Sequence, residues 1–156
     1  MKKAALVLIL FVLLITGCGG RATTDTSGVL QIRENMFLTQ ITDINLNPRE
    51  YLGRTIRLEG FITRNHWNDR DYYFVGRTGP DCCGGDSNIG FQISWNPNLD
   101  SNGLSVEERS NFPEIDEWVE AIGVLHSYDF MGYPYMFLAL SHLNVLEKRG
   151  IEYVTR

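Results

Sequence analysis

Hydrophobic and polar residues alternate along several stretches of this 156-residue chain. In residues 54–64, Ile56, Leu58, Gly60 and Ile62 share one face, and mostly polar residues stand between them. A period of two is typical of an antiparallel strand with one buried face. The pattern therefore predicts a first long strand, in which Gly60 faces inward and allows the backbone to coil tightly.

Similar patterns predict four further strands, at 71–77, 89–95, 118–125 and 134–146. Polar or glycine-rich connections separate them, at 65–70, 78–88, 96–117 and 127–132. Ser105 and Glu108 form a capping-box pattern that predicts a small helix in the third connection. Five strands with a helix between the third and fourth is the order of an OB-fold-like Greek-key barrel. A small sandwich of the same strands is the alternative.

The segment before the first strand gives a mixed signal. Residues 30–44 fit either an extended segment or an irregular helix, because periodicity alone does not decide between them. In residues 47–53, Asn47 can cap, Pro48 suits a first helical turn and Gly53 suits an end, which predicts a single helical turn. The tail at 148–156 has mixed charges and is expected to be peripheral.

The first residues have the pattern of a bacterial lipoprotein signal. Lys2 and Lys3 precede an apolar run at 4–15, which is shorter than the roughly 20 residues of a bilayer-spanning helix. Residues 15–18 (Ile-Thr-Gly-Cys) resemble a lipobox, and an uncleaved anchor is the alternative. We expect a signal peptide at 1–17 and lipidation of Cys18.

This interpretation divides the chain into three parts. They are the signal peptide, a flexible Gly-, Thr- and Ser-rich tether at 18–30 and an OB-fold-like domain at 31–156. Acyl chains on Cys18 would attach the protein to a bacterial membrane, facing outside the cytoplasm. The formal net charge of −5 becomes more negative once Lys2 and Lys3 are removed. An acidic chain argues against nucleic acid as a partner.

The loop between the second and third predicted strands has the residues best suited to chemistry. Cys82, Cys83 and Asp86 stand among glycines there, beside Asp81. Thiolates favour soft ions such as zinc or copper(I), and a carboxylate can complete a site. The pattern predicts a metal site at Cys82, Cys83 and Asp86. Adjacent cysteines suit tetrahedral zinc poorly, so further ligands would come from Asp81, His66, His126 or His142.

Three other interpretations of this loop stay open. The two cysteines could form a vicinal disulfide that stiffens the loop, or they could be buried thiols that pack as small hydrophobic groups. A thiol oxidoreductase would need one cysteine with a lowered pKa. The chain has no Ser-His-Asp signature, no G-x-S-x-G and no phosphate-binding glycine loop, so we expect no catalytic residues and no enzyme.

Aromatic residues offer a different candidate site. Trp67, Tyr72, Tyr73 and Trp95 could line a groove for sugars or peptides. Core and rim packing is the favoured interpretation for these four residues, because aromatic side chains commonly fill the interior of a small barrel.

The chain resembles the C-terminal domain of the YcgQ-like, or DUF1980, family of bacterial membrane proteins. The matching positions include Asn47-Pro48, Tyr51, residues 53–56, residues 73–75 and, most specifically, the Cys-Cys-x-x-Asp run at 82–86. Members usually have transmembrane helices ahead of this domain, where this chain has a lipobox. The resemblance implies a permease-like membrane partner.

Together these features predict a lipid-anchored extracytoplasmic ligand-binding module. We expect it to bind a soft metal ion, zinc or copper, near a membrane transporter. The alternative is a structural or protein-interaction module in which a vicinal disulfide braces the loop.

Overall fold

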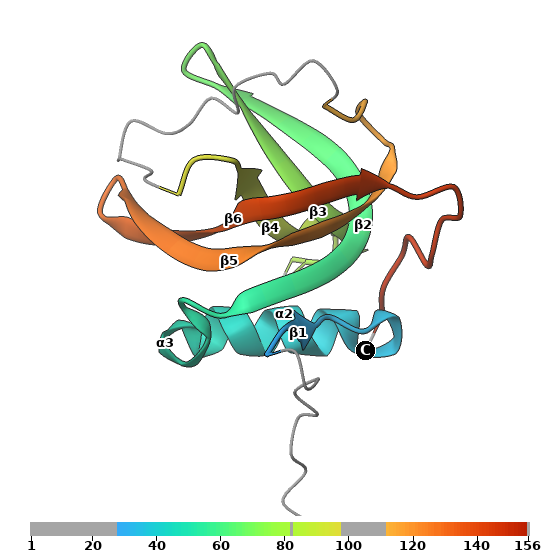
Figure 1. Ribbon diagram of the computed structural model, residues 1–156, viewed down its shortest axis with the longest axis horizontal. Coiled ribbons are helices and arrows are strands. Elements are labelled where there is room, and N and C mark those ends of the chain that lie inside the picture. Colours follow the sequence, from blue (N-terminus) through green and yellow to red (C-terminus); the bar gives the residue numbers. More distant parts are fainter. Residues whose placement is uncertain (1–27, 82, 98–111, 156) are drawn as a thin grey trace, which may run out of the picture.

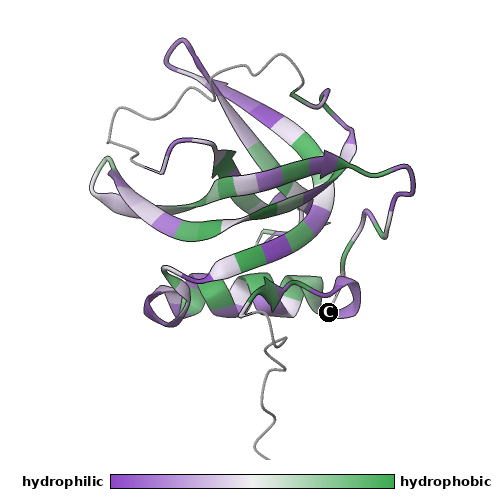
Figure 2. Ribbon diagram, viewed as in Figure 1, coloured by the Kyte–Doolittle hydropathy of each residue, from purple (hydrophilic) through white to green (hydrophobic). Residues whose placement is uncertain are grey.

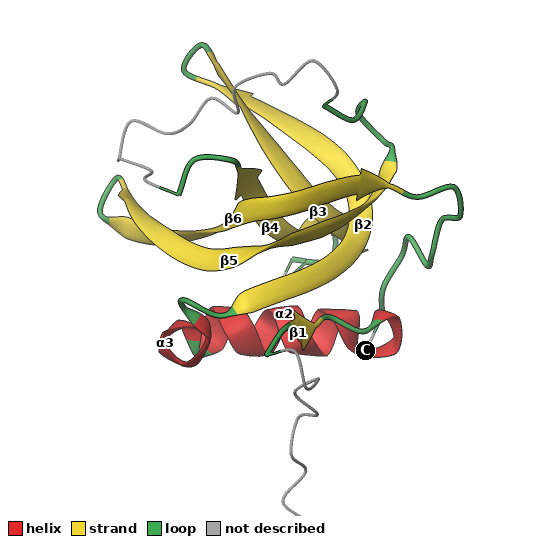
Figure 3. Ribbon diagram, viewed as in Figure 1, coloured by secondary structure: helices red, strands yellow, loops and turns green. Residues whose placement is uncertain are grey.

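The computed structural model describes residues 28–81, 83–97 and 112–155, and within these residues five long strands close into a barrel (Figures 1 and 3). They are β2 (Thr55–Trp67), β3 (Arg70–Pro80), β4 (Asp86–Ser94), β5 (Trp118–Phe130) and β6 (Tyr133–Val145). The order is β2-β3-β4-β6-β5, and pairing of β2 with β5 closes the sheet. All pairs in the barrel are antiparallel except β4 with β6.

This strand order confirms the predicted OB-fold-like Greek-key barrel and excludes the sandwich. The barrel is closed, whereas OB barrels are commonly partly open. The small helix predicted from Ser105 and Glu108 lies in residues 98–111, outside the described residues. Figure 2 shows hydrophobic and hydrophilic residues alternating along the strands, as the period of two requires.

The strands are longer than the sequence pattern predicts. The β2–β3 connection is a two-residue turn at Asn68 and Asp69, both with positive φ, and the β5–β6 turn is Met131 and Gly132, with φ of 55° and 85°. Two-residue turns with positive φ match the natural twist of hairpins. The turns predicted at 65–70 and 127–132 contain these two-residue turns, but their predicted length was wrong, because the strands of both hairpins extend into those ranges.

Two glycines allow the barrel to close. A Cβ on Gly60 would lie 2.2 Å from the carbonyl oxygen of Gly76 in the neighbouring strand. A Cβ on Gly123 would lie 2.6 Å from the carbonyl oxygen of Ala139, beside a shift in register between β5 and β6. The prediction that Gly60 faces inward and permits tight coiling is confirmed.

Short helices cover one end of the barrel (Figure 1). Strand β1 (Leu30–Gln31) pairs in parallel with β2, and the chain continues through η1 (Glu34–Met36), α2 (Phe37–Leu46) and α3 (Pro48–Tyr51). The ambiguous residues 30–44 are thus mainly helical. Helix α2 buries Phe37, Ile41 and Ile44, one helical face, in the core that the strands share. The single turn predicted after Asn47 is confirmed as α3, and Gly53 follows it with φ of 81°.

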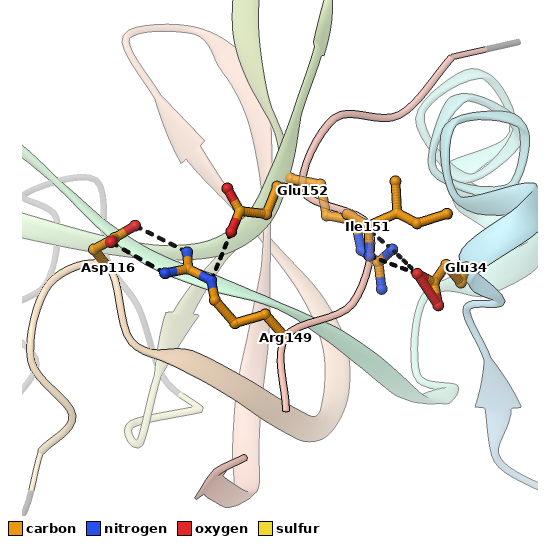
Figure 4. A network of polar contacts seen from close by, with 6 residues as sticks. Glu34, Asp116, Arg149, Ile151 and Glu152 are labelled. Carbon is orange, nitrogen blue, oxygen red and sulfur yellow. Dashed lines mark hydrogen bonds and ion pairs between the residues drawn. The ribbon is translucent and has the colours of Figure 1, made fainter. Parts of the chain in front are cut away.

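The C-terminal tail belongs to the fold rather than to the periphery. Thr78 in β3 donates its N–H to the carbonyl of Glu152 and accepts the N–H of Val154, at 2.9 and 2.8 Å. The Val154 side chain is buried in the core. Farther up the tail, Arg149 forms ion pairs with Asp116 and Glu152 (Figure 4). The expectation of a peripheral tail was therefore wrong.

No helix among the described residues is both long and apolar enough to cross a membrane.

Candidate functional site at the loop between β3 and β4

The loop predicted to bind a metal is a short hairpin connection. Pro80 at the end of β3 pairs with Asp86 at the start of β4, so the loop is confined to 81–85 rather than the predicted 78–88. Asp81 donates its N–H to the carbonyl of Gly85, at 2.9 Å. Its Oδ1 atom accepts the N–H groups of Cys83 and Gly85, each at 2.8 Å. Asp81 therefore braces the loop through backbone contacts.

The electrostatics of the loop follow from this arrangement. The N–H groups of Cys83 and Gly85 stabilise the carboxylate and lower the pKa of Asp81 below its usual range. Gly84 has φ of +86°, a left-handed conformation that favours glycine. The loop thus presents a negative charge to solvent and depends on glycine for its shape.

Cys83 and Asp86 are both exposed. Oδ1 of Asp86 accepts the hydroxyl of Tyr153 at 2.7 Å, and this bond raises the pKa of Tyr153. Because Cys83 is exposed, the interpretation as a buried packing thiol is wrong for that residue. Cys82, the other predicted thiolate ligand, lies outside the described residues.

The histidines considered as helpers lie elsewhere. His66 is near the far end of the β2–β3 hairpin, where its Nδ1 contacts Oδ1 of Asp71 at 2.8 Å. His142 contacts Ser141, and His126 packs beside Phe137. Within the described ranges, which exclude Cys82, no group of three or more His, Cys, Asp or Glu side chains is placed to hold a metal.

The aromatic residues divide between two environments. Trp67 and Tyr72 line a cleft between the β2–β3 and β5–β6 hairpins. Tyr73 and Trp95 instead pack with the core, as the favoured interpretation of the sequence predicts. Gln92 and Tyr128 also line this cleft, and local patterning did not indicate them because they come from separate strands.

The closed barrel with short helices defines a small OB-like β domain, and one of its hairpins carries an exposed cysteine. The chain belongs to the family of the DUF1980 C-terminal domain, whose model matches residues 20–154. This match confirms the family resemblance found in the sequence. No curated protein and no solved structure matched the chain.

Proposed function

We propose that this protein is a lipid-anchored extracytoplasmic ligand-binding module that binds a soft metal ion through Cys82, Cys83 and Asp86. Lipidated Cys18 would hold it at a bacterial membrane, near a permease-like membrane protein. The observation that supports this function best is the braced loop, which keeps the Cys83 and Asp86 positions exposed on a short hairpin.

The roles of the two carboxylates differ. Asp81 uses one oxygen to hold the loop amides, so its role is to shape the loop and add negative charge. Asp86 accepts one hydroxyl from the tail, and a carboxylate has further acceptor capacity for a cation. Two thiolates and a carboxylate suit zinc or copper(I) better than hard cations such as magnesium.

The loop does not need the cysteines for rigidity, because backbone and carboxylate contacts already close it. This favours a ligand role over a brace. One observation favours the alternative of a structural module with a vicinal disulfide: the bond from Tyr153 to Asp86 ties the loop to the tail. A loop that joins two parts of the fold could be retained for stability alone.

Native mass spectrometry of the full chain, purified without chelator in a polyoxyethylene detergent, tests the proposal. We expect one bound zinc or copper ion, which is lost in the double variant Cys82→Ser, Cys83→Ser and after incubation with a chelator. His66→Ala is the matched control, because His66 is exposed and lies on another hairpin, and it should retain the ion. The same mass shows whether Cys18 carries acyl chains.

Two outcomes would contradict metal binding by the cysteine loop. A metal-free protein that is lighter by two hydrogen atoms would establish the vicinal disulfide and favour the structural alternative. A bound ion that survives in the double variant would place the metal at other residues.

A further inference from the structure

The cleft between the two hairpins has the features of a second binding site. Its volume is about 310 Å³, at the lower limit of the roughly 300–1,000 Å³ typical of small-molecule sites. It lies toward the Arg70 end of β3, whereas the cysteine loop follows Pro80 at the other end. Six aromatic rings of the described residues line it: Trp67, Tyr72, Phe74, Tyr128, Phe130 and Tyr135.

The cleft walls come from strands far apart in the sequence. Trp67 of β2 meets Phe130 of β5 edge to face, with ring centroids 5.0 Å apart. The ring of Phe130 in turn packs edge to face against that of Tyr135 in β6, with ring centroids 5.6 Å apart. Trp67 and Tyr135 are each about half exposed, so their rings are accessible at the rim. The two hairpins thus hold a set of rings on which a ligand could stack.

Among the residues that the structure describes, no charged side chain lines the cleft. The polar lining residues are Asn65, Gln92 and the tyrosines, and burial raises the pKa of Tyr128 so that it stays neutral. An anionic ligand would lack a basic partner, and nucleic-acid phosphates require clustered lysine and arginine. The lining therefore selects an uncharged ligand.

Two buried polar groups at the cleft lack partners. Among the described residues, neither the hydroxyl of Tyr72 nor Nε2 of Gln92 has a hydrogen-bond partner, although the residues are only 7% and 2% exposed. Oε1 of Gln92 accepts the hydroxyl of Tyr128 at 2.8 Å. Turning the amide over would exchange its oxygen and nitrogen, and one polar atom would still lack a partner. Buried polar groups are normally paired, so these two favour a ligand that hydrogen-bonds.

We propose that the cleft binds a neutral saccharide of one or two pyranose rings. The apolar C–H face of a pyranose can lie against the aromatic rings, and its hydroxyls can donate to and accept from Tyr72, Gln92 and Asn65. This inference goes beyond metal binding and does not depend on the cysteine loop.

Other neutral or cationic ligands fit less well. An alkyl chain would fill the apolar surface but leave Tyr72 and Gln92 without partners, which costs binding free energy. A quaternary ammonium group can stack on aromatic rings, yet it cannot accept the amide N–H of Gln92 and would find no carboxylate among the described lining residues.

Tryptophan fluorescence and isothermal titration calorimetry of the full chain, in a polyoxyethylene detergent, test the proposal. The probes are glucose, N-acetylglucosamine, maltose and cellobiose, with tetramethylammonium chloride and a tyrosine-containing tripeptide as comparisons. We expect saturable binding of at least one saccharide at one site per chain. Binding should be unchanged in the Cys82→Ser, Cys83→Ser variant, so failure of either proposal is distinguishable from failure of the other.

Two variants locate the site. Tyr72→Phe keeps the ring but removes the unpaired hydroxyl, and should raise the saccharide Kd about tenfold. Trp67→Ala removes a rim ring and should raise the Kd by about tenfold or more. Tyr133→Phe is the matched control, because Tyr133 is 71% exposed and lies on the same hairpin as Tyr135 without lining the cleft.

Three results would overturn the proposal. One is no heat or fluorescence change with any saccharide up to about 10 mM, a concentration at which a site with a Kd of about 1 mM would be roughly 90% occupied. Another is tighter binding of tetramethylammonium or the tripeptide than of every sugar. The third is a saccharide Kd that neither Tyr72→Phe nor Trp67→Ala changes in folded protein.

Discussion

Arg77 is the largest fully buried side chain among the described residues, and it is charged. Its guanidinium lies over the rings of Phe37 and Trp118, at 4.8 and 5.0 Å from the ring centres. It donates to the carbonyls of Glu59 and Ile151, at 3.0 and 2.9 Å. Burial lowers the pKa of Arg77 and nearby Glu34 opposes this effect, so the charge is retained because several partners surround it.

Replacing Arg77 should therefore destabilise the whole barrel. In Arg77→Ala the carbonyls of Glu59 and Ile151 lose a donor and two rings lose their contact with the guanidinium, for which we expect a loss of about 3 kcal/mol in the free energy of unfolding. Urea unfolding followed by circular dichroism measures this loss. Arg64→Ala is the matched control, because Arg64 is exposed and its pair with Asp71 is long, at 3.5 Å; it should cost less than about 1 kcal/mol. Equal losses in the two variants would contradict a special role for Arg77.

Helices α2 and α3 are joined by a carboxylate. Asp43 of α2 accepts the hydroxyl of Tyr51 in α3 and also the side-chain amide of Asn47, at 2.8 Å. The bond from Tyr51, followed by that from Asn47, lowers the pKa of Asp43, and the bond to Asp43 raises the pKa of Tyr51. The hydrogen bond from Tyr51 thus links α3, the last element before β2, to α2.

This contact should make stability depend on pH in two directions. The lowered pKa of Asp43 contributes stability above its unfolded value of about 4, and this is lost as pH falls through the folded pKa. The raised pKa of Tyr51 contributes stability below its unfolded value of about 10, and this is lost as pH rises through the folded pKa. At pH 7 the free energy of unfolding of the wild type should exceed that of Tyr51→Phe by about 1 kcal/mol or less, since solvent screens this exposed pair.

Urea unfolding of wild type and Tyr51→Phe at pH 3, 7 and 11 measures the difference. The difference in free energy of unfolding between the two proteins should be smaller at pH 3 and at pH 11 than at pH 7. Tyr133→Phe, which removes a hydroxyl from an exposed ring, should show no gap at any pH. A gap for Tyr51→Phe that is constant from pH 3 to 11 would contradict the role of Asp43.

At the scale of elements, the sequence predicted those strands and turns whose own residues carry a clear local pattern. The alternation around Ile56 and Leu58 revealed β2, and Pro48 with Gly53 revealed α3. The end of β2 was underestimated because His66 pairs with Asp71 across the hairpin but stays exposed to solvent, so the hydrophobic alternation stops before the strand does. Helix α2 was ambiguous because its three buried residues are too few to establish a period.

The cleft could not be predicted in the same way. Its lining residues are one or two positions on each of five strands, together with Met131 in the β5–β6 turn, and only the closed order of the barrel brings Trp67 beside Phe130. A buried polar atom without a partner, as in Gln92, is a three-dimensional property with no counterpart in composition. The cysteine loop could be recognised in the sequence because its residues are contiguous. The hydrogen bonds by which Asp81 holds the loop could be recognised only in the structure.

At the scale of the whole molecule, β3 connects the two candidate sites. The cleft lies toward the first residues of β3, and the cysteine loop follows its last residue. The two candidate sites are therefore at opposite ends of this strand. Between them, Arg77 and Thr78 of the same strand hold the C-terminal tail. Glu34 completes this link, because its Oε1 accepts the N–H of Ile151 at 2.5 Å (Figure 4).

The tail thus joins the N-terminal helices to β3, and its removal from the core should weaken the whole fold. Val154 is 4% exposed, so Val154→Ala deletes buried methyl groups and should cost about 2 kcal/mol in the free energy of unfolding. The Thr78 amide, which is bonded to the carbonyl of Glu152, should also exchange its hydrogen faster. Urea unfolding and hydrogen exchange measure the two effects. Thr155→Ala, at the exposed neighbouring position, should change stability by less than about 0.5 kcal/mol. If Val154→Ala left both the free energy of unfolding and the exchange rate of the Thr78 amide unchanged, the tail would not contribute to the stability of the barrel.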